Sequence, residues 1–260
     1  MKWRRCAWAL LAAVCALACN AAHAVDDEAP SVTPYRPTVS DPASLSSPGC
    51  IEVETGISSL RDADATRTAT APYLIKYAFD ADHGLLLGGD AWIDVAARHT
   101  HGERGAGDTF LAWKQRFAVD ESSAFGIEAG VETPTARDTL GIGKPAYRII
   151  GIYSVDVGST HLDLNAGGTR FTRAVAHASS WQNAWSAALS HPLSDAFGAA
   201  LELSGTAQRG AHAAHQVLGA INYNLARQCV LDAGIAYGLD RTDHSREFFL
   251  GATWLLGKVR

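Results

Sequence analysis

The sequence has 260 residues, of which 47% are hydrophobic and 19% are charged, and its formal net charge is −5. This acidic balance argues against nucleic acid as a partner, because the phosphate backbone selects basic surfaces. Beyond the amino terminus, no apolar run approaches the about 18 residues that a membrane-spanning helix requires. If the chain spans a membrane, it must therefore do so as a β-barrel.

The first 24 residues have the organisation of a secretory signal peptide. Basic residues precede an apolar stretch over 6–19, and Ala22-His23-Ala24 matches a cleavage site. We expect cleavage after Ala24, with lipid attachment at Cys19 as the alternative. The segment contains three of the 22 basic residues and no acidic residue, so 19 remain against 27 acidic residues and the net charge becomes −8.

Residues 25–49 contain five prolines and little hydrophobic periodicity. They predict an extended periplasmic segment, with a segment tucked into a barrel lumen as the alternative.

From residue 50 onward, apolar and polar residues alternate in one stretch after another, which is typical of strands with two unlike faces. We expect twelve strands, near 50–58, 72–79, 85–95, 110–117, 124–132, 145–154, 159–170, 180–190, 197–206, 215–225, 228–238 and 246–256.

The connections between these strands alternate in length without exception. Short joins at 80–83, 119–123, 155–158, 191–196 and 225–228 alternate with longer ones at 60–69, 97–107, 134–144, 171–179, 206–214 and 239–245. Outer-membrane barrels show this arrangement, with short periplasmic turns and long extracellular loops.

The acidic residues of the expected strands all fall on the polar face. A charge that faces lipid at mid-depth costs about 2–4 kcal/mol for Arg or Lys and less for Asp or Glu, so these residues should line a hydrated interior. We expect them either to form a cation-selective or substrate-orienting wall or to pair across the lumen with inward bases. The lumen-lining candidates are Glu52, Glu54, Lys76, Asp90, Asp94, Lys114, Arg116, Glu128, Glu132, Arg148, His161, Asp163, Asn165, Glu202 and Asp232.

A secreted soluble sandwich is the alternative fold. Strands of about ten residues are long for a globular sheet. Aromatic residues such as Phe79, Trp113, Phe117, Tyr153 and Phe248 gather near strand ends, where the interfacial girdles of a membrane barrel lie. Both features favour the barrel.

Three stretches resemble the outer-membrane transporter family catalogued as "MetA-pathway of phenol degradation". They are RPTVSDPASLSSPGCIEVETG (36–56), ETPTARDTLGIGKP (132–145) and VGSTHLDLNAGGTRF (157–171). The resemblance implies a bacterial outer-membrane barrel with a role in moving small compounds, including aromatic ones. The loop over 134–145 is a candidate constriction.

Other chemistry has weak support. Metal binding is not expected, because His99, His101, His212 and His215 lie in loops without the converging ligands that a metal needs. Catalysis is not expected, because Ser186, Ser204 and His161 form no recognisable motif and the G-x-S-x-G elbow is absent. Cys50 and Cys229 are a candidate disulfide, provided that the chain before residue 50 bends over the rim.

The sequence thus predicts an all-β protein with a signal peptide (1–24), an extended segment (25–49) and an antiparallel up-and-down barrel of about twelve strands (50–260) in the bacterial outer membrane. The expected function is diffusion or facilitated uptake of small, aromatic or hydrophobic solutes. A non-transporting structural or adhesin-like barrel with a filled lumen is the alternative, and an enzyme is a more distant one. We expect no cofactor and no nucleic-acid partner; the expected partners are outer-membrane lipid and lipopolysaccharide, a small-molecule solute and the barrel-insertion machinery.

Overall fold

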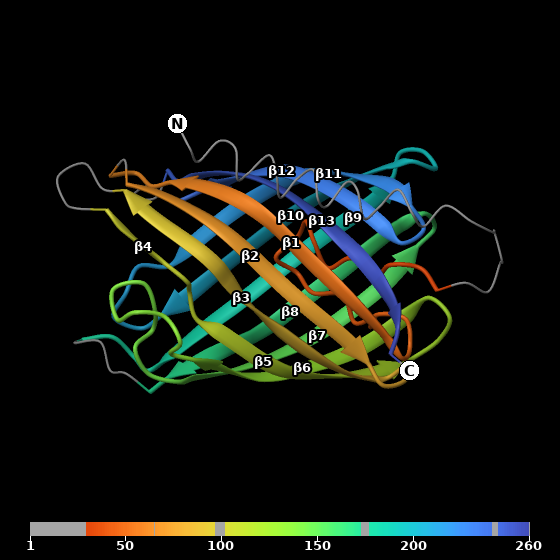
Figure 1. The fold of residues 1–260 in the computed structure, drawn as a ribbon, viewed down its shortest axis with the longest axis horizontal. Helices are drawn as coiled ribbons and strands as arrows, with labels where there is room; N and C mark the ends of the chain where they lie inside the picture. Colours follow the sequence, from red (N-terminus) through yellow and green to blue (C-terminus); the bar gives the residue numbers. More distant parts are fainter. Residues whose placement is uncertain (1–29, 65, 97–101, 173–176, 241–243, 260) are drawn as a thin grey trace. The chain divides into compact units, whose positions relative to one another are not determined.

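The computed structural model describes residues 30–64, 66–96, 102–172, 177–240 and 244–259. Residues Ser31–Arg260 form one compact unit, a barrel of tilted strands (Figure 1). The expected signal peptide with Cys19, and the loop histidines His99 and His101, lie outside the described residues. Within the described residues, no helix has the length and apolarity needed to cross a membrane.

The strands follow one another along the chain with no helix between them in the described part. They are β1 (Cys50–Arg61), β2 (Arg67–Ala78), β3 (His83–Ala96), β4 (Glu103–Gly105), β5 (Thr109–Ala118), β6 (Ser123–Thr133), β7 (Ala146–Val157), β8 (Thr160–Phe171), β9 (Trp181–Pro192), β10 (Phe197–Gln208), β11 (Ala214–Ala226), β12 (Cys229–Gly238) and β13 (Arg246–Lys258).

The sheet closes on itself because β1 pairs with both β2 and β13, and every neighbouring pair is antiparallel. Among the described residues, the short strand β4 is the one addition to the expected set. It pairs with the far half of β3, whose near half pairs with β5, so β4 continues the position of β5 in the wall. The wall therefore has twelve strands, and the predicted all-β antiparallel barrel is confirmed.

Turns at one end of the barrel are tight and loops at the other end are longer, as the join lengths predict. The turn from β7 to β8 shows why a tight turn forms: Val157 pairs directly with Thr160, and Gly158 takes a φ of 63° that favours glycine. In outer-membrane barrels the short turns face the periplasm and the long loops face outward.

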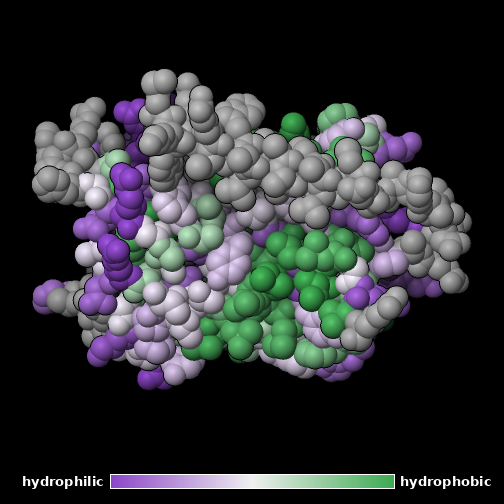
Figure 2. Space-filling view, viewed as in Figure 1, coloured by the Kyte–Doolittle hydropathy of each residue, from purple (hydrophilic) through white to green (hydrophobic). Residues whose placement is uncertain are grey.

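Strand β10 illustrates how alternation divides the two faces of the wall. Leu201 and Leu203 are 56% and 47% exposed on the outside, whereas Glu202 and Ser204 are 1% and 5% exposed on the inside. Hydrophobic residues gather across the middle of the outer face, and hydrophilic residues gather toward the two ends (Figure 2). An exposed apolar band with a polar, buried interior is the pattern of a barrel immersed in lipid.

Outward aromatic residues lie near the short turns. Phe125 and Tyr153 on neighbouring strands have ring centroids 4.8 Å apart, and Phe197 and Tyr223 have theirs 4.9 Å apart. Such rings occupy the headgroup level of a bilayer, so these pairs form part of an interfacial girdle.

Candidate functional site

Most of the lumen-lining candidates are buried on the inner face of the wall. Glu52, Glu54 and Lys76 come from β1 and β2, where Glu52 and Lys76 are direct cross-strand partners. Lys114 and Glu128 are likewise partners across β5 and β6. Charges at these positions are stable only when paired or hydrogen-bonded. The buried candidates are Glu52, Glu54, Lys76, Lys114, Glu128, Asp163, Asn165, Glu202 and Asp232.

Four further candidates lie on the inner face in less buried positions. Arg148 pairs with Glu128 in mid-barrel. Arg116 lies near the short turns, 3.2 Å from Asp82. Asp90 and Glu132 lie toward the long loops and line a cavity there.

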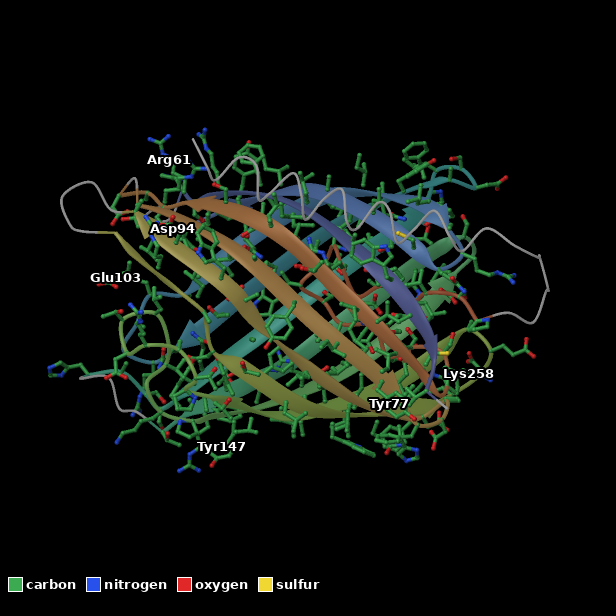
Figure 3. The ribbon with its side chains drawn as sticks, viewed as in Figure 1. Arg61, Tyr77, Asp94, Glu103, Tyr147 and Lys258 are labelled. Carbon is green, nitrogen blue, oxygen red and sulfur yellow. The ribbon has the colours of Figure 1, made fainter. Side chains whose placement is uncertain are left out.

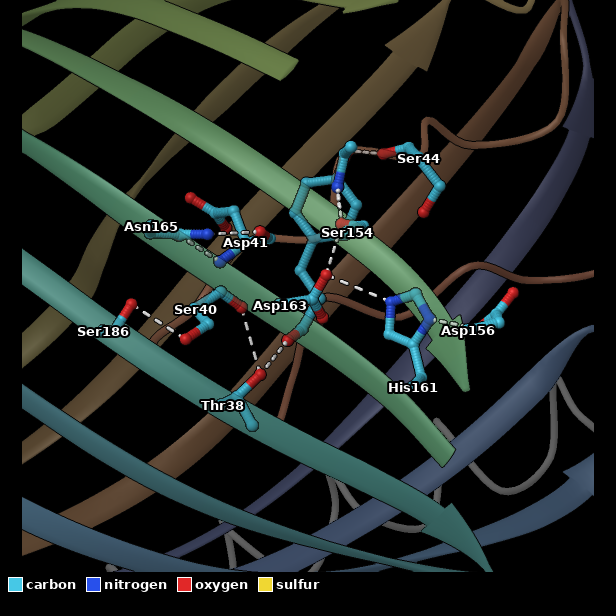
Figure 4. Close-up of polar contacts among 12 residues, drawn as sticks. Thr38, Ser40, Asp41, Ser44, Ser154, Asp156, His161, Asp163, Asn165 and Ser186 are labelled. Atoms are coloured by element: carbon cyan, nitrogen blue, oxygen red, sulfur yellow. Dashed lines mark hydrogen bonds and ion pairs between the residues drawn. The ribbon is translucent and has the colours of Figure 1, made fainter. Parts of the chain in front are cut away.

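His161, at the short-turn end of β8, has both ring nitrogens against carboxylates. Nδ1 lies 2.6 Å from Asp156 and Nε2 lies 3.0 Å from Asp163. The neighbouring hydroxyl of Ser154 bonds to Asp163 rather than to the imidazole (Figure 4). This arrangement orients the ring between two anions and does not form a Ser-His pair.

The prediction that Asp94 faces the lumen is wrong. The β2–β3 register shifts by one residue at Pro72, which has no amide N–H for a strand ladder. Beyond the shift, Ile93 lies opposite the inward Thr70, and Asp94 takes the outward face opposite Ala69. One extra residue in a strand exchanges the two faces for everything beyond it.

The largest departure from expectation concerns residues 31–49, which we name the luminal segment. The sequence predicts an extended periplasmic segment, with a segment tucked into the lumen as the alternative. The structure agrees with the alternative, because the segment bonds to inward side chains of the wall. Tyr35 is 4% exposed and packs against the inward Leu86 and Ala112. Residues 25–29 lie outside the described part of the chain.

Main-chain N–H groups of the luminal segment bind the carboxylates of β1. Thr33 N donates to Glu52 Oε2 over 2.8 Å, and Tyr35 N donates to Glu54 Oε1 over 2.8 Å. Arg36 N donates to the other oxygen of Glu54 over 3.1 Å. Charge-assisted bonds of this kind are stronger than bonds between neutral groups. The two inward glutamates of β1 thus fix the entry of the luminal segment into the barrel.

Two buried lysines complete this side of the contact. Lys76 Nζ lies 2.6 Å from both Glu52 Oε1 and Glu54 Oε1. Lys76 and Lys114 each place their Nζ 3.9 Å from the centroid of the Tyr35 ring. Cations near an aromatic face gain from its quadrupole, so Tyr35 anchors the luminal segment between two lysines.

Other strands hold the luminal segment through polar groups of β7–β10 and β12. Figure 4 shows the contacts with Ser154, Asn165 and Ser186. Ser40 N donates to Glu202 Oε2, and Ser40 Oγ donates to Ser186 Oγ, both over 2.8 Å. Asp41 and Asn165 exchange two bonds, from Asp41 N to Asn165 Oδ1 and from Asn165 Nδ2 to Asp41 O. Further contacts join Ala43 N to Ser154 Oγ and the Arg36 guanidinium to both oxygens of Asp232.

The inward acids therefore have a role that sequence reasoning did not consider. The two roles expected from the sequence are a charged wall and cross-lumen pairs, and neither involves the residues before the first strand. Several of the acids instead accept hydrogen bonds from the backbone of the luminal segment. Main-chain N–H donors are present at every residue except proline, so the sequence does not show which of them bind these acids. The one feature of the sequence that indicated additional partners was the excess of inward acids over inward bases.

The luminal segment leaves two cavities along the opposite side of the interior. One, of about 680 Å³, lies toward the short turns and is lined by the segment with Ser190, Asn222 and Asn224. The other, of about 430 Å³, lies toward the long loops and is lined by Val39, Thr169, Thr206 and Gln216, among others. Residues next to the bonded stretch at Ser40 and Asp41 line both cavities: Thr38 and Pro42 line the first, and Val39 and Asp41 line the second.

The 134–145 loop lies beside a third cavity, of about 400 Å³, at the long-loop end. Asp108 holds the loop: its carboxylate accepts from Ala136 N over 2.9 Å and from Ile142 N over 2.6 Å. Leu140, Gly141 and Ile142 line the cavity together with Asp90 and Glu132. Asp108 was missed by the sequence analysis, because it lies in a connection rather than in an alternating strand.

The candidate disulfide is absent from the described chain, where Cys50 and Cys229 are both buried and are not bonded to each other. Strand β13 separates them, and Cys50 lies opposite Lys258 whereas Cys229 lies opposite Trp254. Four residues of offset correspond to about 13 Å along a strand. That offset alone exceeds the about 7 Å that a disulfide can span between Cα atoms.

Closure without free edges, an outward apolar band and a polar interior define this protein as an outer-membrane β-barrel. Comparison with solved structures finds the same fold in outer-membrane proteins that include channels. The chain is similar to the COG4313 outer membrane channel from Pseudomonas putida F1, with a TM-score of 0.63 and 12% identity over 90% of this chain and 100% of the other.

Two further structures share the fold at lower similarity. The KdgM porin in complex with disordered oligogalacturonate gives a TM-score of 0.54 at 9% identity, over 78% of this chain and 98% of the other. The CymD monoaromatic hydrocarbon channel gives 0.51 at 8% identity, over 80% and 89%. No family model and no curated protein matches the sequence, so the phenol-degradation family stays a resemblance.

Proposed function

We propose that this protein is an outer-membrane channel for small solutes whose bore is narrowed by its own luminal segment. The observation that carries the proposal is the pair of cavities, of about 680 and 430 Å³, on the two sides of Ser40 and Asp41. Solutes would pass along the side of the lumen formed by β8–β11, opposite the Tyr35 anchor. The similarity of the fold to channels and porins supports this reading.

The lining of the path supports a cargo of small hydrophilic molecules. Asn222 and Asn224 face the first cavity, and Thr169, Thr206 and Gln216 face the second. Charged residues of both signs also line the cavities, Arg36 and Asp163 in the first and Asp41 and Arg148 in the second. The lining therefore offers hydrogen bonds without a strong field of one sign. One protein of similar fold is a monoaromatic hydrocarbon channel, and another is a porin in complex with oligogalacturonate. Because one fold serves such different solutes, the cargo of this protein must be inferred from its own lining residues. The aromatic cargo implied by the family resemblance is the competing prediction.

Planar-bilayer recordings test the channel directly. The refolded protein should give a small single-channel conductance. A variant that lacks residues 31–46 should give a severalfold larger one, because the segment that narrows the bore is gone. The heat-induced mobility shift of folded barrels on electrophoresis serves as the folding control. A wild-type protein without conductance contradicts the proposal and favours the non-transporting barrel with a filled lumen.

Liposome swelling separates the two classes of cargo. Small neutral sugars should enter vesicles that contain the protein faster than aromatic acids of similar size. Faster entry of the aromatic acids would support the cargo implied by the resemblance instead.

We further propose that residues 1–24 are removed on export, so that Val25 begins the mature chain. Amino-terminal sequencing of protein purified from outer membranes tests this; a lipid-modified Cys19 would contradict it.

A further inference from the structure

Three arginines lie side by side at the long-loop rim of the barrel, on three adjacent strands. Arg61 at the end of β1 is the register partner of Arg67 on β2 and of Arg246 on β13. Neighbouring strands lie about 4.8 Å apart, so the three side chains start within about 10 Å of one another. Like charges directly opposite one another on a sheet are destabilising. This arginine row therefore calls for an anionic counterpart.

The row faces outward, on the side of the wall that meets the membrane. Arg61 shares a strand face with Ile57, which is 57% exposed. Arg246 shares one with Phe248 and Leu250, which are 59% and 56% exposed. Figure 3 labels Arg61 at the same end of the barrel as Asp94 and Glu103, away from Lys258. The arginines thus stand directly above an apolar surface, at the level of the outer headgroups.

The contacts of the row within the described chain are with neutral groups. Arg67 Nε donates to the Ser59 hydroxyl over 3.2 Å, and the Arg246 guanidinium lies 5.8 Å from the centroid of the Tyr237 ring. None of the ion pairs in the described residues includes the three arginines. The outward carboxylate of Asp94 on β3 lies opposite a different arginine, Arg104.

We infer that the arginine row is a binding site for a phosphorylated lipid of the outer leaflet, of the lipopolysaccharide type. Guanidinium groups bind phosphate oxygens in a bidentate manner, and adjacent arginines can share one phosphate or hold two. The apolar surface of Ile57, Phe248 and Leu250 below the row accepts the acyl chains of the same molecule. A free phosphate ion would use the arginines alone, so this apolar surface selects the lipid. The inference holds whether or not the barrel conducts.

Another arginine at this rim provides a matched control. Arg170, at the end of β8, is exposed on the outside and lies between Tyr147 and Trp181 in the register. It has the same charge at the same end of the barrel, but its strand neighbours are aromatic rather than basic. If the whole rim attracted anions, lipid binding would fall equally when Arg61 or Arg170 is replaced. If the arginine row is the site, replacing Arg61 weakens lipid binding and replacing Arg170 does not.

Native mass spectrometry of the full-length barrel in neutral detergent tests the site with a defined probe, lipid A carrying two phosphates. We expect wild-type protein to bind this lipid about tenfold more tightly than the same lipid without phosphates, from one or two charge-assisted contacts. Arg61→Gln should remove most of that preference, and the triple change of Arg61, Arg67 and Arg246 to Gln should abolish it. Arg170→Gln should bind as wild type does.

Thermal unfolding is measured separately, and the unfolding temperature should not fall together with lipid binding. Because Arg61→Gln relieves repulsion within the row, the variant should unfold at an equal or higher temperature than wild type in lipid-free detergent. Equal binding of the phosphorylated and unphosphorylated lipids would overturn the inference. So would an equal loss in Arg170→Gln, or displacement of lipid A by inorganic phosphate at an equal concentration.

Discussion

Single inward carboxylates connect the wall of this barrel to the segment inside it. Asp232 shows the arrangement most simply, because its two oxygens accept from Arg36 Nε at 3.0 Å and Nη2 at 2.9 Å while its side chain is almost fully buried. A bidentate pair of this kind fixes both the position and the direction of the luminal segment. Removing one partner would leave the other charge buried without compensation.

We therefore expect Arg36→Gln to weaken docking of the luminal segment by about 3 kcal/mol, the usual cost of breaking a buried pair from one side. Hydrogen exchange should show faster exchange at the amides of Tyr35 and Ser40, which bond to Glu54 and Glu202 in the docked state. The double variant with Asp232→Asn should recover part of the protection. Unchanged exchange in Arg36→Gln would show that Asp232 does not hold the segment.

A second residue-scale prediction concerns the β2–β3 turn, outside the membrane. Hydrogen bonds from Asp82 N and from the His83 side chain lower the pKa of Asp80 below its usual 3.8. Because a lowered pKa favours the ionised form in the folded state, the stabilisation is present above the ordinary pKa and is lost as pH falls through the lowered one. The turn should keep its structure throughout neutral and mildly acidic pH.

Carboxyl NMR measures the Asp80 titration. Its midpoint should lie below 3.8 in the folded barrel, and Asp80→Asn should remove the part of the pH-dependent change in the Asp82 amide that follows this midpoint. A midpoint at or above the ordinary value would mean that these bonds do not form in solution.

Within each strand, the alternation of polar and apolar residues predicted which side chains face inward for most of the wall. It could do so because one face of a strand meets lipid and the other meets the polar interior. It failed locally where the backbone departs from a regular ladder. The register shift at Pro72 places Asp94 outside, and no property of Asp94 itself signals the change. Alternation specifies a face only while the pairing is continuous.

The lipid-facing surface of β10 gives a quantitative prediction. Leu203→Arg, in the middle of the strand, should lower the free energy of unfolding in bilayers by about 2–4 kcal/mol. Leu193→Arg, in the exposed turn before the strand, should cost about 0–1 kcal/mol because the charge reaches water there. Urea titrations of both variants in lipid vesicles compare the two positions. Equal costs would indicate that Leu203 does not face the hydrocarbon.

For the whole molecule, the sequence predicts the class of fold, but it leaves the position of residues 31–49 open between the periplasm and the barrel lumen. The alternation of polar and apolar residues and the lengths of the joins are local patterns, so both can be recognised from the sequence alone. The luminal segment depends on contacts between residues far apart, such as Asp41 with Asn165 and Arg36 with Asp232, which no local pattern records. Its four prolines disfavour a regular strand without indicating where the segment lies.

The luminal segment also changes what the inward charges are for. They were expected to act on a passing solute or on one another, and many of them hold the segment instead. The path that we propose for a solute runs through the two cavities, past residues 38–41. The proposed function requires that ions pass along this path.

Val39 is the position that tests this claim most directly, because it is 57% exposed and lines the cavity toward the long loops. In planar bilayers, a bulky charged methanethiosulfonate should sharply reduce the single-channel current of Val39→Cys, and a reducing agent should restore it. Wild-type protein, with Cys50 and Cys229 buried, should not respond. An unchanged current after complete modification of Val39→Cys, verified by mass spectrometry, would contradict a path along the luminal segment.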